Sequence, residues 1–215
     1  MLLVINNLAK RLLRGLTRLR REARRRARRM MYHKKVSTIS SDCCGGILYH
    51  DRMQEFLSPT VNLFFSNEDF ILFCMHLKEF VESEIAQKQE TETKYPVGII
   101  KTEFGSVELH FMHYDSFIDA VNNWRRRAKR LDYDNICIIM NAGKEASEEI
   151  IAKFKDIPYK NKALLTSGAN TKMFSYCFNL ECYEKGFSGS ITKYKSNYSV
   201  KRYLDDFSFD KFIMG

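Results

Sequence analysis

Apolar residues recur at every third or fourth position through the first 32 residues, which is the period of a helix with one apolar face. The stripe consists of Ile5, Leu8, Leu12, Leu16, Leu19, Ala23, Ala27 and Met30. Arginines fill the other faces, and the stripe changes from leucine to alanine after Leu19. The pattern predicts one long amphipathic helix over residues 1–32, with Gly15 as a weak interior position.

From residue 36 onward, short apolar runs alternate with amphipathic segments. The runs predict strands at residues 36–40, 97–101, 107–112, 135–140 and 162–166, and a strand or extended segment at 60–65. Capping boxes at residues 66–69 and 116–119 begin two predicted helices, and a third helix is predicted at about 145–156. A strand at 174–178 and a helix at 198–205 are expected in the less readable C-terminal third.

This alternation predicts an α/β domain over residues 36–215, built in three layers with a mainly parallel sheet and flanking helices. Residues 1–35 form a separate unit, the long basic helix. Residues 135–140 are almost continuously apolar, which is typical of a strand buried on both faces. Ligands of such sheets bind beyond the carboxyl ends of the strands, where we expect the loops 41–46, 141–143 and 167–170.

The positive charge of the chain is concentrated in this first helix. The 215 residues carry 35 Lys and Arg and 26 Asp and Glu, a net charge of +9. Residues 1–35 hold 13 of those bases and one acid, or +12, which leaves −3 for the remainder. This asymmetry indicates a localised contact with a polyanion and not a basic domain face.

Three interpretations of the basic helix stay open. A membrane-surface helix accounts for both the apolar stripe and the arginines, and it places the protein in the cytoplasm, peripheral to the inner face of the cell membrane. A nucleic-acid arm accounts for the charge but leaves the stripe without a purpose, so nucleic acid is disfavoured. A helix that binds a protein partner or self-associates is the third, and the sequence does not indicate an oligomeric state.

Targeting and cofactor signals are absent from the sequence. No apolar stretch reaches the roughly 18–20 residues that span a bilayer. The apolar start is short and precedes the charges, unlike a secretory signal, and a mitochondrial leader is disfavoured because no serine precedes Ser37. The six cysteines include no CxxC pair, so we expect a reducing compartment, free thiols, and neither a metal nor a cofactor.

The loop Asp42-Cys43-Cys44-Gly45-Gly46 is the first candidate for chemistry. Its glycines would let a backbone approach a phosphate, and Cys43 would be a nucleophile if a helix N-terminus lowered its pKa. The simpler interpretation is a tight turn with buried thiols. His113, at the predicted end of a strand, is a better placed acid or base than His110, and Trp124 is expected in the core.

Several segments resemble the DUF1919 family, whose members are commonly called exopolysaccharide or capsular polysaccharide biosynthesis proteins. Residues 39–46, Ile-Ser-Ser-Asp-Cys-Cys-Gly-Gly, are similar to the family opening Ile-Ser-Asn-Asn-Cys-Trp-Gly-Gly. The segments Tyr-Pro-Val-Gly (95–98), His-Phe-Met-His-Tyr (110–114), Trp-Arg-Arg-Arg (124–127) and Asp-Asn-Ile (134–136) follow in the family order. The resemblance covers about residues 36–190, and the sequence departs from the family pattern at Asp42 and Cys44.

The resemblance implies an α/β fold and a role in surface polysaccharide biosynthesis, without an established reaction. We therefore expect a membrane-associated glycosyl-, acyl- or phosphate-group transferase acting on a carbohydrate or sugar-phosphate intermediate. A non-catalytic carbohydrate-binding or scaffold protein is the alternative. The catalytic candidates are Cys43, Asp42 and His113. The candidates for substrate binding are Gly45, Gly46, His110, Arg126, Arg127 and Asn141.

Overall fold

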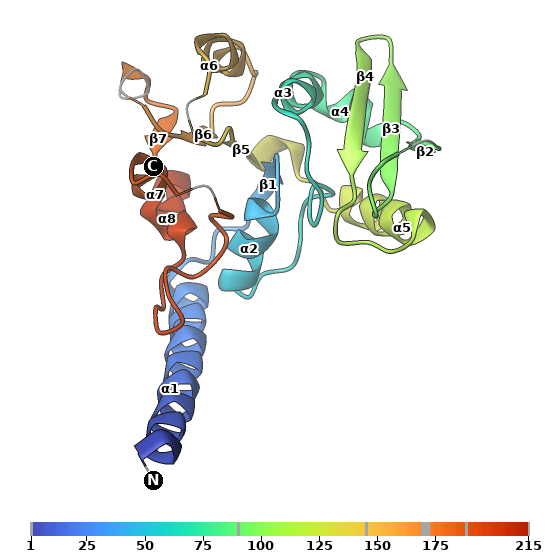
Figure 1. Ribbon diagram of the computed structural model, residues 1–215. Coiled ribbons are helices and arrows are strands. Elements are labelled where there is room, and N and C mark those ends of the chain that lie inside the picture. Colours follow the sequence, from blue (N-terminus) through green and yellow to red (C-terminus); the bar gives the residue numbers. More distant parts are fainter. Residues whose placement is uncertain (1, 90, 145, 169–172, 188, 215) are drawn as a thin grey trace.

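The computed structural model describes residues 2–89, 91–144, 146–168, 173–187 and 189–214 (Figure 1). The predicted first helix is confirmed as one element, α1 (Leu2–Met31). Its N-terminal turns extend beyond the folded body. The side chains of Ile5 and Leu8, both in the predicted stripe, lie outside the described residues.

A four-stranded parallel sheet forms the centre of the body, in the order β1-β5-β6-β7. Its strands are β1 (Ser37–Ser40), β5 (Ile136–Asn141), β6 (Lys162–Thr166) and β7 (Cys177–Asn179). The first three were predicted from their apolar runs. β7 covers the end of the expected strand and continues one residue past it.

Helices cover both faces of this sheet, so the predicted three-layer α/β arrangement is confirmed. Side chains of β5 alternate between two cores. Ile138 and Met140 pack with residues of α3 (Asn67–Met75) and α6 (Glu148–Lys155). Cys137 and Ile139 pack with residues of α2 (Cys44–Asp51), α7 (Glu181–Glu184) and α8 (Phe209–Met214).

A second, antiparallel sheet lies beyond α3 and α4 (Leu77–Glu82) (Figure 1). It consists of β2 (Ala86–Gln87), β3 (Val97–Thr102) and β4 (Gly105–His110), in that order. α5 (Phe117–Ala128) packs here through Trp124, which is only 2% exposed, as expected of a core residue. The described residues also include the single-turn 3-10 helices η1 (Tyr133–Asn135) and η3 (Tyr203–Asp206).

Several sequence-based boundaries differ from the structure. Residues 60–65 bend at Val61 and Asn62, where φ of Asn62 is 66°, and form a β-bridge to His110 at Phe64. The helix predicted from residue 66 is interrupted at His76, where the backbone leaves helical geometry (φ −127°, ψ 46°). The helix expected at 198–205 is reduced to η3. Residues 44–46 form the first turn of α2 and not a loop.

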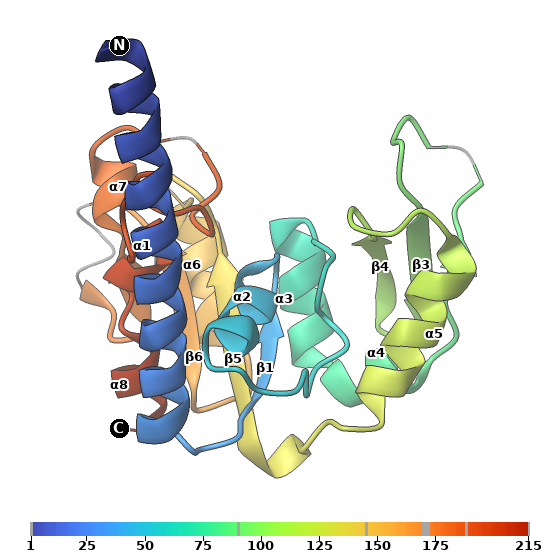
Figure 2. The ribbon, with the colours of Figure 1, turned by 90° about the horizontal axis from the view of Figure 1, so that it is seen from below.

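Helix α1 packs on the body through arginines and not through its apolar stripe. Figure 2 shows it running along the side of the body that carries the C-terminal segment, and Arg28 lies 3.6 Å from Asp210 of α8. Arg21 donates to the carbonyl oxygens of Ser199 (2.8 Å) and Ser196 (3.1 Å), and its guanidinium lies 3.5 Å from the ring centre of Tyr194. The docked face of α1 is therefore cationic and polar.

Three carboxylates of the body pair with Arg24 and Arg28 of α1. Arg24 and Arg28 donate to Asp205 at 2.9 and 2.7 Å, and Arg28 also lies 3.8 Å from Asp51 and 3.6 Å from an oxygen of Asp210. Burial alone would raise the pKa of the Asp205 carboxyl, but the hydrogen bond and charge of Arg28 outweigh it, so this pKa is lowered. These arginines are thus unavailable to an external anion.

The leucine stripe consequently faces solvent. Leu12, Leu16 and Leu19 are 62%, 57% and 68% exposed, and Met30 is 74% exposed. Exposed side chains of this size in a row are unusual for a soluble surface and mark an interaction face. Among the described helices, none combines the length and apolarity needed to cross a bilayer.

Candidate functional site

The loops that follow β1 and β5 meet at the carboxyl edge of the parallel sheet, as the sequence predicted. The amide of Ser41 donates to the carbonyl oxygen of Ile139, and the amide of Asn141 donates to Ser41 Oγ at 2.9 Å. The loop after β6 adjoins them, since Thr166 Oγ1 donates to the Gly143 carbonyl at 2.8 Å. Ala169 and Asn170, also expected at this edge, lie outside the described residues.

Asp42 is held in place from two sides at this edge. Its Oδ1 accepts the amide of Cys44 at 2.8 Å, and its Oδ2 accepts Asn141 Nδ2 at 2.8 Å. Asn141 is fixed in turn, because its Oδ1 accepts the hydroxyl of Tyr183 (2.9 Å) and the amide of Gly143 (3.2 Å). Asn141 therefore contacts Asp42 and orients it.

Tyr183 is a member of this network that sequence reasoning missed. It lies on the four-residue helix α7, which shows no amphipathic period because it is a single turn. Burial raises the pKa of Tyr183 to about 12. Its hydroxyl therefore keeps its proton at neutral pH and acts as the donor to Asn141.

Cys43 and His113 come together although they are 70 residues apart in the sequence. Cys43 Sγ lies 3.1 Å from His113 Nε2, and Met112 Sδ lies 3.9 Å from the same sulfur. Cys43 precedes the first residue of α2, whereas His113 follows β4, which ends at His110. Because the strand has already ended, His113 is free to turn toward the parallel sheet.

The hypothesis of a nucleophilic Cys43 needed a lowered pKa, but the surroundings of Cys43 raise it. Burial, and then the negative charge of Asp42, raise the pKa of the Cys43 thiol to about 11. The N-terminus of α2 does not reverse this effect. Cys43 is therefore a protonated thiol at neutral pH, and its sulfur becomes nucleophilic only when that proton is removed.

We expect iodoacetamide to alkylate Cys43 slowly at pH 7, with a rate that rises about tenfold per pH unit toward pH 11, because only the thiolate reacts. The Asp42→Asn variant should react faster at a given pH, since the charge that raises the Cys43 pKa is removed. Peptide mass spectrometry across a pH series measures both rates.

Cys177 provides the internal control for this experiment. It is half-buried like Cys43, and burial alone raises its pKa to about 11. The Asp42→Asn substitution should leave the alkylation of Cys177 unchanged. Rapid alkylation of Cys43 at pH 7 would contradict the assignment of a neutral thiol.

Gly45 and Gly46, predicted as phosphate contacts, are buried in the first turn of α2 and pack against protein. A Cβ at Gly45 would lie 2.5 Å from Ser40 Oγ, and a Cβ at Gly46 would lie 3.1 Å from a methyl of Val61. The Gly45 amide already donates to Ser40 Oγ at 3.0 Å. The glycines let α2 approach β1 and the segment around Val61.

The other predicted binding residues lie elsewhere in the structure. His110 stacks on Phe64 at 4.3 Å, and the described residues show no hydrogen bond between it and the Cys43–His113 pair.

Arg127 is buried and donates to the Val61 carbonyl (3.2 Å) and to Tyr114 (2.8 Å), so it ties α5 to the loop packed on Gly46. Arg126 is exposed and donates to Asn123 on its own helix. Neither arginine is positioned beside Cys43 by a described contact.

Comparison with known families identifies the fold that carries this site. The family model of DUF1919, a domain of unknown function, matches residues 15–214. The chain belongs to the DUF1919 family. An uncharacterized protein of Haemophilus influenzae strain Rd is similar, with 32% identity over 194 residues, or 88% of this chain and 89% of the relative.

The match corrects the extent that the sequence resemblance suggested. It begins at Gly15, within α1, and continues to residue 214, whereas the resemblance covered about residues 36–190. The arginines that dock on the body therefore lie inside the DUF1919 region. This extent agrees with the contacts of Arg21, Arg24 and Arg28, which make the second half of α1 part of the folded domain.

Proposed function

We propose that this DUF1919 protein acts in surface polysaccharide biosynthesis while bound peripherally to the inner face of the bacterial cell membrane. There it would transfer a glycosyl, acyl or phosphate group to or from a carbohydrate or sugar-phosphate intermediate. The observation that carries the membrane location is the exposed leucine stripe of α1. That stripe lies on a helix whose opposite, arginine face is already occupied by the body of the protein.

The combination of apolar and basic side chains favours a lipid surface over a nucleic acid as the partner of this stripe. Nucleic-acid backbones offer phosphates but no apolar layer, so they would leave Leu12, Leu16 and Leu19 in water. A membrane offers both, because leucines enter the acyl boundary while arginines remain among the head groups. Exposed arginines beside the stripe, such as Arg20 and Arg26, suit an anionic leaflet, at about 1 kcal/mol per base.

The chemistry is proposed for the Cys43–His113 pair. His113 accepts the thiol proton, the thiolate attacks the group to be transferred, and the leaving group departs with the proton from His113. His113 then takes the proton of the acceptor hydroxyl, which attacks the Cys43 adduct and releases the thiolate. In the second route, without an adduct, His113 takes the proton of the acceptor hydroxyl, which displaces the leaving group from the donor directly. Asp42, fixed by Asn141 and the Cys44 amide, adds a negative charge beside the pair. The carboxyl edge of a parallel sheet is also the ordinary place for a ligand.

We expect cells that lack the gene to regain surface polysaccharide when they express the wild-type protein but not Cys43→Ala or His113→Ala. Loss of the nucleophile or of the acid–base group should reduce the polysaccharide by about 100-fold. Cys177→Ala is the matched control, because it removes a half-buried thiol outside the site. Polysaccharide is measured against the protein level in each strain.

The same variants separate the enzyme from the alternative, a non-catalytic carbohydrate-binding or scaffold protein. A binding protein should tolerate Cys43→Ser, which keeps a small polar group but loses the nucleophilic sulfur. If polysaccharide remains normal in Cys43→Ala and His113→Ala cells, the catalytic proposal fails and a scaffold remains.

A further inference from the structure

A cavity lies at the opposite, amino-terminal edge of the parallel sheet. It has a volume of about 290 Å³, and its walls are the end of α1 with the segment leading to β1, and the turn that follows α2. Lys35 is two residues before β1, whereas Cys43 lies beyond the other end of that strand. The cavity is therefore separate from the Cys43–His113 pair.

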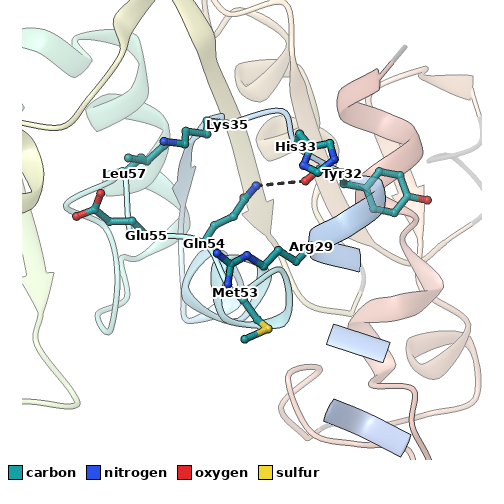
Figure 3. A pocket seen from close by; sticks show the side chains of 8 residues that line it. All are labelled: Arg29, Tyr32, His33, Lys35, Met53, Gln54, Glu55 and Leu57. Atoms are coloured by element: carbon teal, nitrogen blue, oxygen red, sulfur yellow. Dashed lines mark hydrogen bonds between the residues drawn. The ribbon is translucent and has the colours of Figure 1, made fainter. Parts of the chain in front are cut away.

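Three basic side chains, Arg29, His33 and Lys35, line this cavity (Figure 3). Within the described part of the chain, none of them has an ion-pair or side-chain hydrogen-bond partner. The neighbouring arginines differ in this respect, because Arg24 and Arg28 are both paired with carboxylates of the body. Carboxylates of the body thus neutralise Arg24 and Arg28, whereas no described carboxylate neutralises Arg29 or Lys35.

The one carboxylate in the lining is already neutralised. Glu55 forms an ion pair with Arg130, whose Nη2 lies 2.9 Å from Glu55 Oε1, and Figure 3 shows the Glu55 carboxylate directed away from Arg29. The backbone that carries the bases is fixed: the Lys34 ammonium donates to the Ile213 carbonyl at 2.7 Å, and Gln54 Nε2 reaches the Tyr32 and Lys34 carbonyls at 3.5 and 3.4 Å. The cavity is thus a cationic site with little backbone to reorganise.

We propose that Arg29, His33 and Lys35 bind a phosphate group in this cavity. A planar guanidinium and an ammonium in one concave site are the side chains that recognise phosphate oxygens. The phosphate comes either from a soluble phosphorylated ligand or from the head group of an anionic lipid beside α1. The site goes beyond the proposed transfer chemistry, because no step of that chemistry uses it.

Titration of the full-length protein with inorganic phosphate and with glycerol 3-phosphate, by calorimetry, tests the soluble source. Sedimentation with phosphatidylglycerol vesicles, compared with phosphatidylcholine vesicles, tests the lipid source. The pocket variant is Arg29→Ala with Lys35→Ala. The control is Arg11→Ala with Arg18→Ala, which removes the same charge from exposed positions of α1 outside the cavity.

We expect the pocket variant to bind its preferred probe at least about tenfold more weakly than the control does, because two charge-assisted contacts are lost. A selective loss with the soluble probes identifies a soluble phosphate ligand, and a selective loss with vesicles alone identifies a head group. If no probe distinguishes the two double variants, the proposal is overturned. That outcome would leave vesicle binding through the leucine stripe unaffected. The membrane proposal is therefore tested separately, by variants of the leucine stripe.

Discussion

The Leu12→Ala, Leu16→Ala, Leu19→Ala triple variant should lose nearly all binding to anionic vesicles while its fold remains intact. These three side chains are more than half exposed in the structure and contribute little to the core. At the membrane they would enter the acyl boundary, where each truncation removes about 1 kcal/mol of apolar transfer energy if the leucine is roughly half-buried. The sum, about 3 kcal/mol, corresponds to a decrease of roughly a hundredfold in the partition coefficient.

Leu13→Ala is the matched control for the stripe. Leu13 is 50% exposed but lies off the stripe by the helical period, so its truncation should change vesicle binding only slightly. Vesicle flotation measures the partition coefficient, and thermal unfolding verifies that all variants keep wild-type stability. If the triple variant floats with vesicles as the wild type does, the stripe does not bind the membrane.

Asp205→Ala should lower the free energy of unfolding by about 3 kcal/mol, because it leaves partly buried arginines without a counter-charge. The Asp205 side chain is only 9% exposed, and it accepts hydrogen bonds from Arg24, Arg28 and the amide of Arg202. Loss of this carboxylate should also release α1 from the body. Urea unfolding measures the first effect, and the rate of trypsin cleavage after Arg24 and Arg28 measures the second.

Glu22→Ala is the control for Asp205→Ala, because it also removes a carboxylate that pairs with arginines of α1 but does not hold α1 to the body. Glu22 pairs with Arg25 and Arg26 on its own helix and is 31% exposed, so its removal should change the free energy of unfolding far less than Asp205→Ala does. Equal stabilities of the Asp205→Ala and Glu22→Ala variants would show that the Asp205 contacts do not hold α1 to the body.

Acid should weaken the same contacts. Burial opposes ionisation of Asp51 and Asp205, but the hydrogen bonds and charges of Arg202 and Arg28 outweigh it and lower both pKa values. Groups with a lowered folded-state pKa stabilise the fold above the unfolded pKa of about 4, and this contribution is lost as the pH falls through the folded pKa. We expect trypsin cleavage in α1 to accelerate below about pH 4 after correction for protease activity, and to change less in Asp205→Ala. A pH-independent rate would contradict this account.

The sequence by itself determined the elements whose signals are local. The three-to-four period specified α1, the apolar runs specified β1, β5 and β6, and the serines at 66 and 116 cap α3 and α5 as the capping boxes predicted. Helical periodicity and N-capping each depend on residues that are close in the sequence, so they can be recognised without a tertiary structure. The parallel order of the strands then placed Asp42, Cys43 and Asn141 at one edge.

The tertiary structure alone decided which face of α1 is free and what surrounds Cys43. Arginines occupy several faces of α1, so only the distant carboxylates Asp51, Asp205 and Asp210 select the face that docks. The partner of Cys43, His113, comes from the segment that follows the antiparallel sheet, and burial and then the Asp42 charge raise the pKa of the thiol. These properties depend on groups far apart in the chain, whose distances and desolvation exist only once the chain has folded.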